Sequence, residues 1–137
     1  MSTDSVLGTT NNPYPVTLTA GFDGNNQPYF LYFNPQGQSM VSPLVIPSAE
    51  RPYDSIRFTQ TGDITQLRFW AVVTHTLDDS SPVPQGDNLL FAVGGTVAIT
   101  VNGGTWRGSV LIFEQLDENG VVTKLVPTPD PTTQNDG

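Results

Sequence analysis

The chain has 137 residues, among them 13 Gly and 12 Pro, which is enough for one domain with a real core and too few for two ordinary domains. Its net charge of −8 argues against nucleic acid and anionic membranes as partners, because both attract Lys and Arg. The absence of cysteine excludes disulfides, thiolate metal sites and cysteine nucleophiles.

Residues 1–14 are polar and lead into a Pro-Tyr-Pro sequence. We predict an extended N-terminal arm for residues 1–14, followed by a single β-sandwich domain over residues 15–126. The first residues carry neither the basic nor the apolar region of a secretory signal, and no apolar run approaches the ~20 residues of a membrane span. We therefore expect a cytoplasmic protein, or one released without a classical signal, and the compartment stays open.

Four extended segments are predicted in the first half of the domain. In Val16–Phe22, apolar residues alternate with Thr and Gly, which is the pattern of a strand with one buried face. Tyr29–Phe33 is apolar on both faces and therefore indicates a central strand or an interface. Leu44–Ile46 lies between two prolines, which suits a sheet edge, and Ile56–Thr59 alternates again.

The longest predicted strand, Leu67–Leu77, opens the second half of the domain. We expect alternate residues to share one buried face: Leu67, Phe69, Ala71, Val73 and Leu77. After a polar loop, Leu89–Val101 is interpreted as one long strand or two short ones, with Gly94-Gly95 as a bulge or bend.

Two tight-turn sequences, Asn102–Gly104 and Asp117–Gly120, predict that the last strands form a meander through Trp106–Leu116 to Val121–Val126. Residues 127–137 have three prolines at alternate positions and no large apolar side chain. We therefore predict that residues 127–137 are a Pro-rich, flexible tail.

These short segments, separated by Gly and Pro turns, indicate an all-β protein. The chain has one Lys and three Glu, too few for the (i, i+4) ion pairs of exposed helices. We predict an antiparallel β-sandwich of about seven or eight short strands, with a small β-barrel as the alternative.

The sequence offers little material for catalysis. A nucleophile needs a neighbouring base, usually His, and the only histidine is His75. It lies near the end of a predicted strand, where a hydrogen bond to a loop explains it. The other interpretation makes it a base for Ser80 or Ser81, so a hydrolase is kept as the third hypothesis.

Glu114 is the one acidic residue well inside a predicted strand. A buried carboxylate without a partner is costly, so we expect Glu114 to pair with one of three arginines: Arg68, Arg107 or Arg57. No second strand-borne acid offers itself as the partner that a glycosidase would need.

Oxygen-rich side chains gather at the two ends of the polar loop after the longest strand: Asp78, Asp79, Asp87 and Asn88. Carboxylate and amide oxygens are the ligands that Ca²⁺ prefers. Acids and Asn are also common in β-turns for backbone reasons. We therefore predict no cofactor, with a structural or ligand-bridging Ca²⁺ as the alternative.

Three aromatic residues, Trp70, Trp106 and Tyr53, lie where exposure is plausible. Trp70 is on the more polar face of its predicted strand, Trp106 follows a Gly-rich turn, and Tyr53 is in a loop. Exposed aromatic rings stack on sugars or anchor protein interfaces, whereas buried rings would belong to sandwich packing. With the loop residues, they form the predicted ligand-binding set.

The function predicted from these features is binding or assembly without catalysis. The first hypothesis is a self-assembling structural or interaction protein, a homo-oligomer or the partner of another protein, because strands apolar on both faces suggest sheet surfaces that meet another subunit. The second is a lectin-like module that holds a neutral glycan, with or without Ca²⁺.

Overall fold

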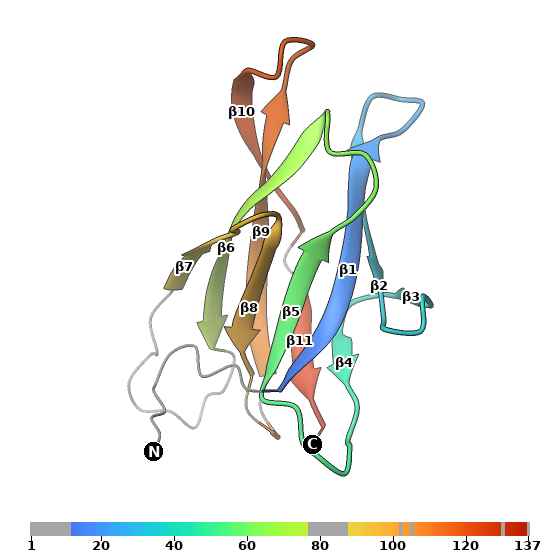
Figure 1. Cartoon of the computed structure of the whole chain (residues 1–137), viewed down its shortest axis with the longest axis vertical. Coiled ribbons are helices and arrows are strands. Elements are labelled where there is room, and N and C mark those ends of the chain that lie inside the picture. The colour runs from blue at the N-terminus through green and yellow to red at the C-terminus, as the bar shows by residue number, and fades with distance from the viewer. Residues whose placement is uncertain (1–11, 77–87, 102, 105, 130, 137) are drawn as a thin grey trace.

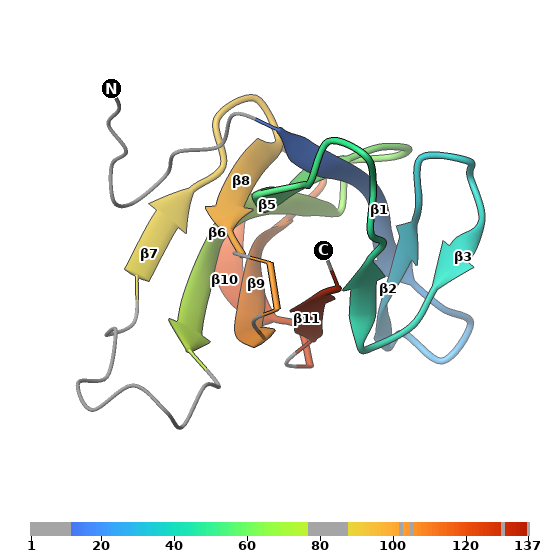
Figure 2. The same ribbon diagram turned by 90° about the horizontal axis from the view of Figure 1, so that it is seen from below.

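The computed structural model describes residues 12–76, 88–101, 103–104, 106–129 and 131–136; of His75, Thr76 and Asn88 it describes the backbone alone. These residues form two β-sheets packed face to face, with no helix and no closed barrel (Figures 1 and 2). The all-β sandwich prediction is therefore confirmed. The strands are β1 (Pro13–Phe22), β2 (Pro28–Phe33), β3 (Ser39–Met40), β4 (Leu44–Ile46), β5 (Ser55–Gln60), β6 (Leu67–Thr76), β7 (Asn88–Phe91), β8 (Thr96–Thr100), β9 (Trp106–Leu116), β10 (Val122–Pro127) and β11 (Thr132–Asn135).

Both sheets are mixed, which corrects the prediction of purely antiparallel sheets. One sheet has the order β3-β2-β1-β5-β8, and the other has the order β4-β11-β9-β6-β7, with β10 also paired to β9. β1 is parallel to β5, and β4 is parallel to β11. The chain leaves the first sheet through β4 and returns at β5, and a crossover of this kind is what parallel neighbours require.

Alternation along the strands builds one core between the sheets. In β1, Val16, Leu18 and Ala20 are buried, as their period-2 pattern predicts. Aromatic rings close the space between the layers: Phe113 of β9 lies 5.1 Å from Phe30 and 5.3 Å from Phe69, between ring centroids. Residues that follow the alternation therefore form the interior.

A β-bulge at Trp70 changes the phase of β6. Phe69 pairs with Phe113 and Ala71 with Ile112, so Trp70 is the extra residue. Val72 and Thr74 are buried beyond the bulge, whereas Val73 is only partly buried. The predicted face is therefore wrong at Val73, because a bulge moves later residues to the opposite face. Leu67, Phe69 and Ala71 are buried as predicted, and Leu77 lies outside the described residues.

The segment Leu89–Val101 forms two short strands that belong to different sheets. β7 pairs with β6, and β8 pairs with β5. Gly94 and Gly95 have φ of 64° and 78°, a left-handed pair that glycine adopts without strain. The predicted meander is therefore wrong between β8 and β9, which lie in different sheets, while the β9–β10 hairpin through Asp117 is confirmed.

The two predicted termini differ from the structure. Pro13 and Tyr14 already belong to β1, and residues 1–11 of the predicted arm lie outside the described residues. In the predicted tail, β11 fills the place between β4 and β9, with Thr133 and Asn135 buried. Composition missed this strand because its buried side chains are small and polar. Two hydrogen bonds stabilise the Asn135 side chain, whereas the buried Thr133 hydroxyl has no hydrogen-bond partner among the described residues.

The segment Tyr29–Phe33 belongs to β2, which is the second strand from the edge of its sheet. Phe30 and Tyr32 pack on the core, and Tyr29 and Leu31 are exposed on the outer face. Leu44–Ile46 is the edge strand that its flanking prolines predict. In the described part of the chain, no helix is long and apolar enough to cross a membrane.

Candidate functional site

The loop residues of the predicted ligand set cannot be placed. Asp78, Asp79 and Asp87 lie outside the described residues, and Asn88 is described only by its backbone, as the first residue of β7. The calcium hypothesis for this loop therefore stays a prediction. Elsewhere in the described ranges, no three His, Asp or Glu side chains are grouped to hold a metal ion.

Tyr53 has a structural environment. Its ring lies 5.0 Å from the ring of Tyr14 in an edge-on arrangement, and its backbone carbonyl accepts a hydrogen bond from the buried Asn135 side chain. Burial, and secondarily the neighbouring Tyr53, raises the pKa of Tyr14. We assign Tyr53 to packing at this end of the sandwich.

Trp106 and Trp70 do not share a site. Trp106 is 44% exposed at the start of β9, where it pairs with Gln134 of β11. Trp70 lies on β6 near the other end of β9, beside Ile112 and Phe113 in the register. Six residues of extended chain separate these positions by about 20 Å, so the two candidate stacking platforms lie on separate surfaces.

Trp70 lines a cleft of about 490 Å³, which we call the Trp70 cleft. It opens where the chain crosses from β7 to β8 and meets the loop between β5 and β6. Strand and loop residues from four segments line it: Gln60, Ile64, Arg68, Phe69, Trp70, Ala92, Gly94, Gly95 and Glu114. Its volume is within the range of small-molecule sites.

The aromatic wall of this cleft is fixed in place. The Trp70 ring meets Phe91 of β7 edge-on, with centroids 5.3 Å apart. The Trp70 carbonyl accepts a hydrogen bond of 2.8 Å from Ala92 N–H. The β-bulge and these two contacts hold one partly buried ring in the lining of the cleft.

An ion pair supplies the polar wall. Arg68 donates from Nε and Nη2 to Oε1 of Glu114, at 3.0 and 2.9 Å. This is one of the three pairings expected from the sequence. Arg68 side-chain exposure is 46% and that of Glu114 is 17%, so the pair is at the rim and in contact with water.

Gln60 lines the cleft and joins the two sheets. Its side chain donates to Leu67 O and accepts from Phe69 N–H, both at 2.7 Å. The Gln60 amide therefore hydrogen-bonds to the β6 backbone as a neighbouring strand would, and both of its polar atoms have protein partners without a ligand. The sequence indicated Trp70 as a candidate binding residue and Arg68 as a candidate ion-pair partner. It did not indicate Gln60, Ile64 and Gly94, because these residues reach the cleft only through the crossover between the sheets.

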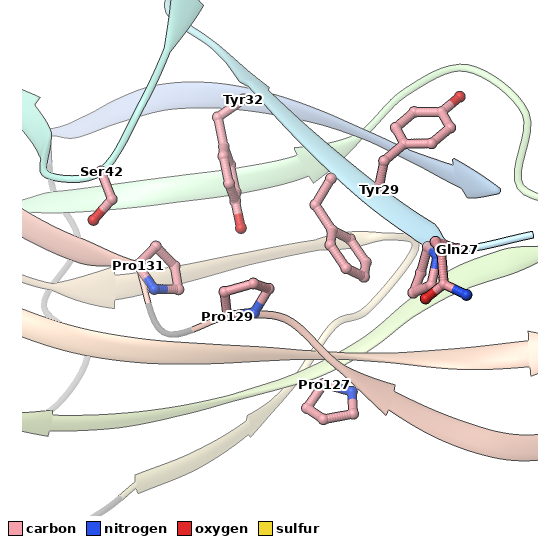
Figure 3. A pocket seen from close by; sticks show the side chains of 9 residues that line it. Gln27, Tyr29, Tyr32, Ser42, Pro127, Pro129 and Pro131 are labelled. Atoms are coloured by element: carbon pink, nitrogen blue, oxygen red, sulfur yellow. The ribbon is translucent and has the colours of Figure 1, made fainter. Parts of the chain in front are cut away.

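A second concavity, the proline groove, has a volume of about 510 Å³. Figure 3 shows Tyr32 reaching from β2 toward Pro129 and Pro131, while Tyr29 points away from the three prolines. Burial raises the pKa of Tyr32 to about 12, against a smaller opposite effect of its hydrogen bond with Thr128. The groove is the seam where the C-terminal segment packs on the first sheet.

A third feature is an apolar strip on the edge strand β7 and the turn after it. Leu89, Phe91 and Val93 are 48%, 55% and 79% exposed. Leu90, between them, faces Val72 and packs on the core. The strip is therefore the outer face of an edge strand whose inner face is already used.

The described residues assemble no acid–base pair for the hydrolase hypothesis. Glu114 is engaged by Arg68. His75 pairs by its backbone with Gly108 at the end of β6. Burial lowers the pKa of Arg107, whose Nη2 donates to Thr74 at 3.0 Å, and this pairing is a packing contact. The hydrolase hypothesis stays a prediction.

No protein-family model matches the sequence, and no curated protein sequence matches it.

Proposed function

We propose that this protein is a non-catalytic interaction module that self-associates through β7. The observation that carries the proposal is the apolar strip Leu89, Phe91 and Val93, exposed on a strand at the end of its sheet. Among the described strands, β7 pairs on one side alone, with β6. Its other edge presents backbone groups that a further strand can bond.

The composition of this edge favours a second copy as the partner. The twelve residues of Leu89–Thr100 include no charge and no proline. Two copies of a chain with net charge −8 repel each other over most of their surfaces. Among the described residues, β7 and the turn after it carry no carboxylate, so two copies can approach there at a low electrostatic cost.

The geometry of the contact follows from symmetry. Antiparallel pairing of β7 with β7 of a second copy uses the same surface twice, as a two-fold interface does. The sheet then continues across the dimer, and the two apolar strips join into one patch on its outer face. Backbone hydrogen bonds supply affinity, and Phe91 and Leu89 exclude water beside them.

The test is Phe91→Lys on β7, compared with Val45→Lys on the opposite edge strand β4. Val45 is also an exposed apolar residue, 36% exposed. We expect Phe91→Lys to weaken self-association by about 10- to 100-fold, because an ammonium group must lose water in the patch. Val45→Lys should leave association unchanged. Sedimentation velocity over a range of protein concentrations measures both.

Two results would overturn the proposal. One is a wild-type chain that stays monomeric at the highest soluble concentration. The other is an equal loss of association in both variants, which would mean that added positive charge, and not the β7 edge, controls the equilibrium. Circular dichroism of each variant establishes that the sheet content is retained.

A further inference from the structure

We infer that the Trp70 cleft binds a neutral sugar unit. The cleft lies within one copy of the chain, and all the residues that line it belong to that copy. The inference does not depend on self-association, although Phe91 of β7 contacts Trp70 and so belongs to both surfaces. It rests on the Trp70 ring beside an ion pair that, among the described residues, leaves one nitrogen of Arg68 and one oxygen of Glu114 without a protein partner.

The aromatic face suits the apolar side of a pyranose ring. The bulge, the Ala92 hydrogen bond and the edge-on contact with Phe91 set the position of Trp70. A pre-positioned ring loses little conformational freedom when a ligand stacks on it. Large flat rings with one exposed face are efficient platforms for ligands that are part apolar and part polar.

The ion pair suits hydroxyl groups. Both donor nitrogens of Arg68 that bond Glu114 share one oxygen, Oε1. Within the described residues, Arg68 Nη1 and Glu114 Oε2 have no hydrogen-bond partner. A sugar hydroxyl both donates and accepts, so neighbouring hydroxyls can donate to Oε2 and accept from Nη1 at the same time.

Charge selects a neutral ligand. A carboxylate or phosphate would be attracted by Arg68 but repelled by Glu114 and by the net charge of −8. A cation would meet the guanidinium. A purely apolar ligand would bury the polar pair and leave its free atoms without partners, which is costly. A neutral polyhydroxylated ring avoids all three penalties.

The backbone turn leaves room for such a ligand. No heavy atom lies within 4 Å of the position that a Cβ on Gly94 would occupy. The volume of about 490 Å³ is within the usual range for small-ligand sites, roughly 300–1,000 Å³. The turn at Gly94 therefore lies beside open space, and its φ of 64° explains why glycine stands there.

The experiment is a calorimetric titration of the full chain with glucose, galactose, mannose, N-acetylglucosamine and their disaccharides, with glucuronate as the charged counterpart. The two tryptophans give a matched pair of variants, since Trp106 is exposed on another surface. We expect saturable binding of at least one neutral sugar, weakened about tenfold or more by Trp70→Ala and unchanged by Trp106→Ala. Glucuronate should bind more weakly than glucose.

Glu114→Gln provides a second variant that keeps the aromatic packing intact. It removes a carboxylate acceptor, so the affinity for the neutral sugar should fall while the fold, checked by circular dichroism, stays the same. The inference is overturned if none of the neutral sugars binds saturably to the wild-type chain, or if Trp70→Ala and Trp106→Ala reduce binding equally.

Discussion

The two sides of the sandwich protect their sheet edges in different ways. One side consists of β7 and β8, and the opposite side of β3 and β4 (Figure 2). The β7–β8 side comes from Leu89–Thr100, which contains neither charge nor proline. By contrast, β3 has two residues, and β4 has three residues between Pro43 and Pro47.

The β3–β4 side is also tied down by the C-terminal segment. Asp136 N–H donates to Ile46 O at 3.0 Å, and Ser48 donates to Asp136 O at 3.1 Å. Thr132 N–H donates to the Ser42 hydroxyl at 3.1 Å. The bonds to Asp136 continue the ladder between β4 and β11, so β4 stays the edge of its sheet. Its short length and its flanking prolines are devices that limit pairing between molecules. We call the β3–β4 side, which carries these devices, the closed side, and the β7–β8 side, where Leu89–Thr100 has no proline and no charge, the open side.

The largest expected loss of stability comes from removing the strand next to β4 on the closed side. Deleting residues 131–137 removes β11 from between β4 and β9. The lost hydrogen bonds and packing are comparable with a domain's whole stability of about 5–15 kcal/mol, so we expect no cooperative unfolding transition. Thermal unfolding followed by circular dichroism measures this.

A milder variant covers the case in which the deleted chain cannot be purified. The Asn135 side chain donates to Tyr53 O at 2.9 Å and to Val101 O at 2.7 Å. Asn135→Ala leaves both carbonyls without this donor and should lower the free energy of unfolding by about 2–4 kcal/mol. A loss no greater than that of Gln134→Ala on the same strand would show that β11 is not part of the stabilising structure.

The next prediction uses pH to loosen the closed side. Tyr32 lies in the proline groove (Figure 3), and burial raises its pKa to about 12 from the ordinary value of 10.0. The folded state holds the phenolic proton more tightly than the unfolded state does. The resulting stability is complete below pH 10 and is lost as pH rises toward 12, by about 2–3 kcal/mol in total.

Denaturant unfolding between pH 8 and 12 tests this prediction. Tyr32→Phe removes the ionising group and keeps the ring, so the stability of this variant should fall less steeply above pH 10 than that of the wild type. If the free energy of unfolding falls equally with pH in the two proteins, ionisation of Tyr32 does not destabilise the packing of the C-terminal segment on the first sheet.

The fold was predictable where a local pattern determines it. Alternation in Val16–Phe22 is sufficient to define β1, and Asp117–Gly120 defines a hairpin because Asp117 accepts hydrogen bonds from Asn119 and Val121 N–H within the turn. The C-terminal strand was missed because β11 is stabilised by partners from β4 and β9. These partners are far away in the sequence, and Thr and Asn carry no apolar signal.

The candidate site shows the same limit. Trp70 and the pairing of Arg68 with Glu114 were within reach of the sequence, since both follow from strand faces. Their meeting with Gly94 requires the crossover from β7 to β8, and the orientation of Trp70 requires a bulge. Neither register shifts nor the choice of sheet is encoded in periodicity, so the cleft itself could not be predicted.

The smallest expected effect is that of a substitution at Val93, and it tests how far the contact surface of the open side extends beyond β7. Val93 is more exposed than Phe91, 79% against 55%, but it follows the end of β7 and pairs only in an isolated bridge with Thr96. We expect Val93→Lys to change the free energy of unfolding by less than about 0.5 kcal/mol and to weaken self-association less than Phe91→Lys does. Sedimentation velocity of the two variants compares strand with turn. In pairing along the β7 backbone, the position of a side chain on the strand, and not its exposure alone, decides whether the partner covers it. A greater effect of Val93→Lys would therefore mean that the contact is made through the exposed turn, and it would refute pairing along the β7 backbone.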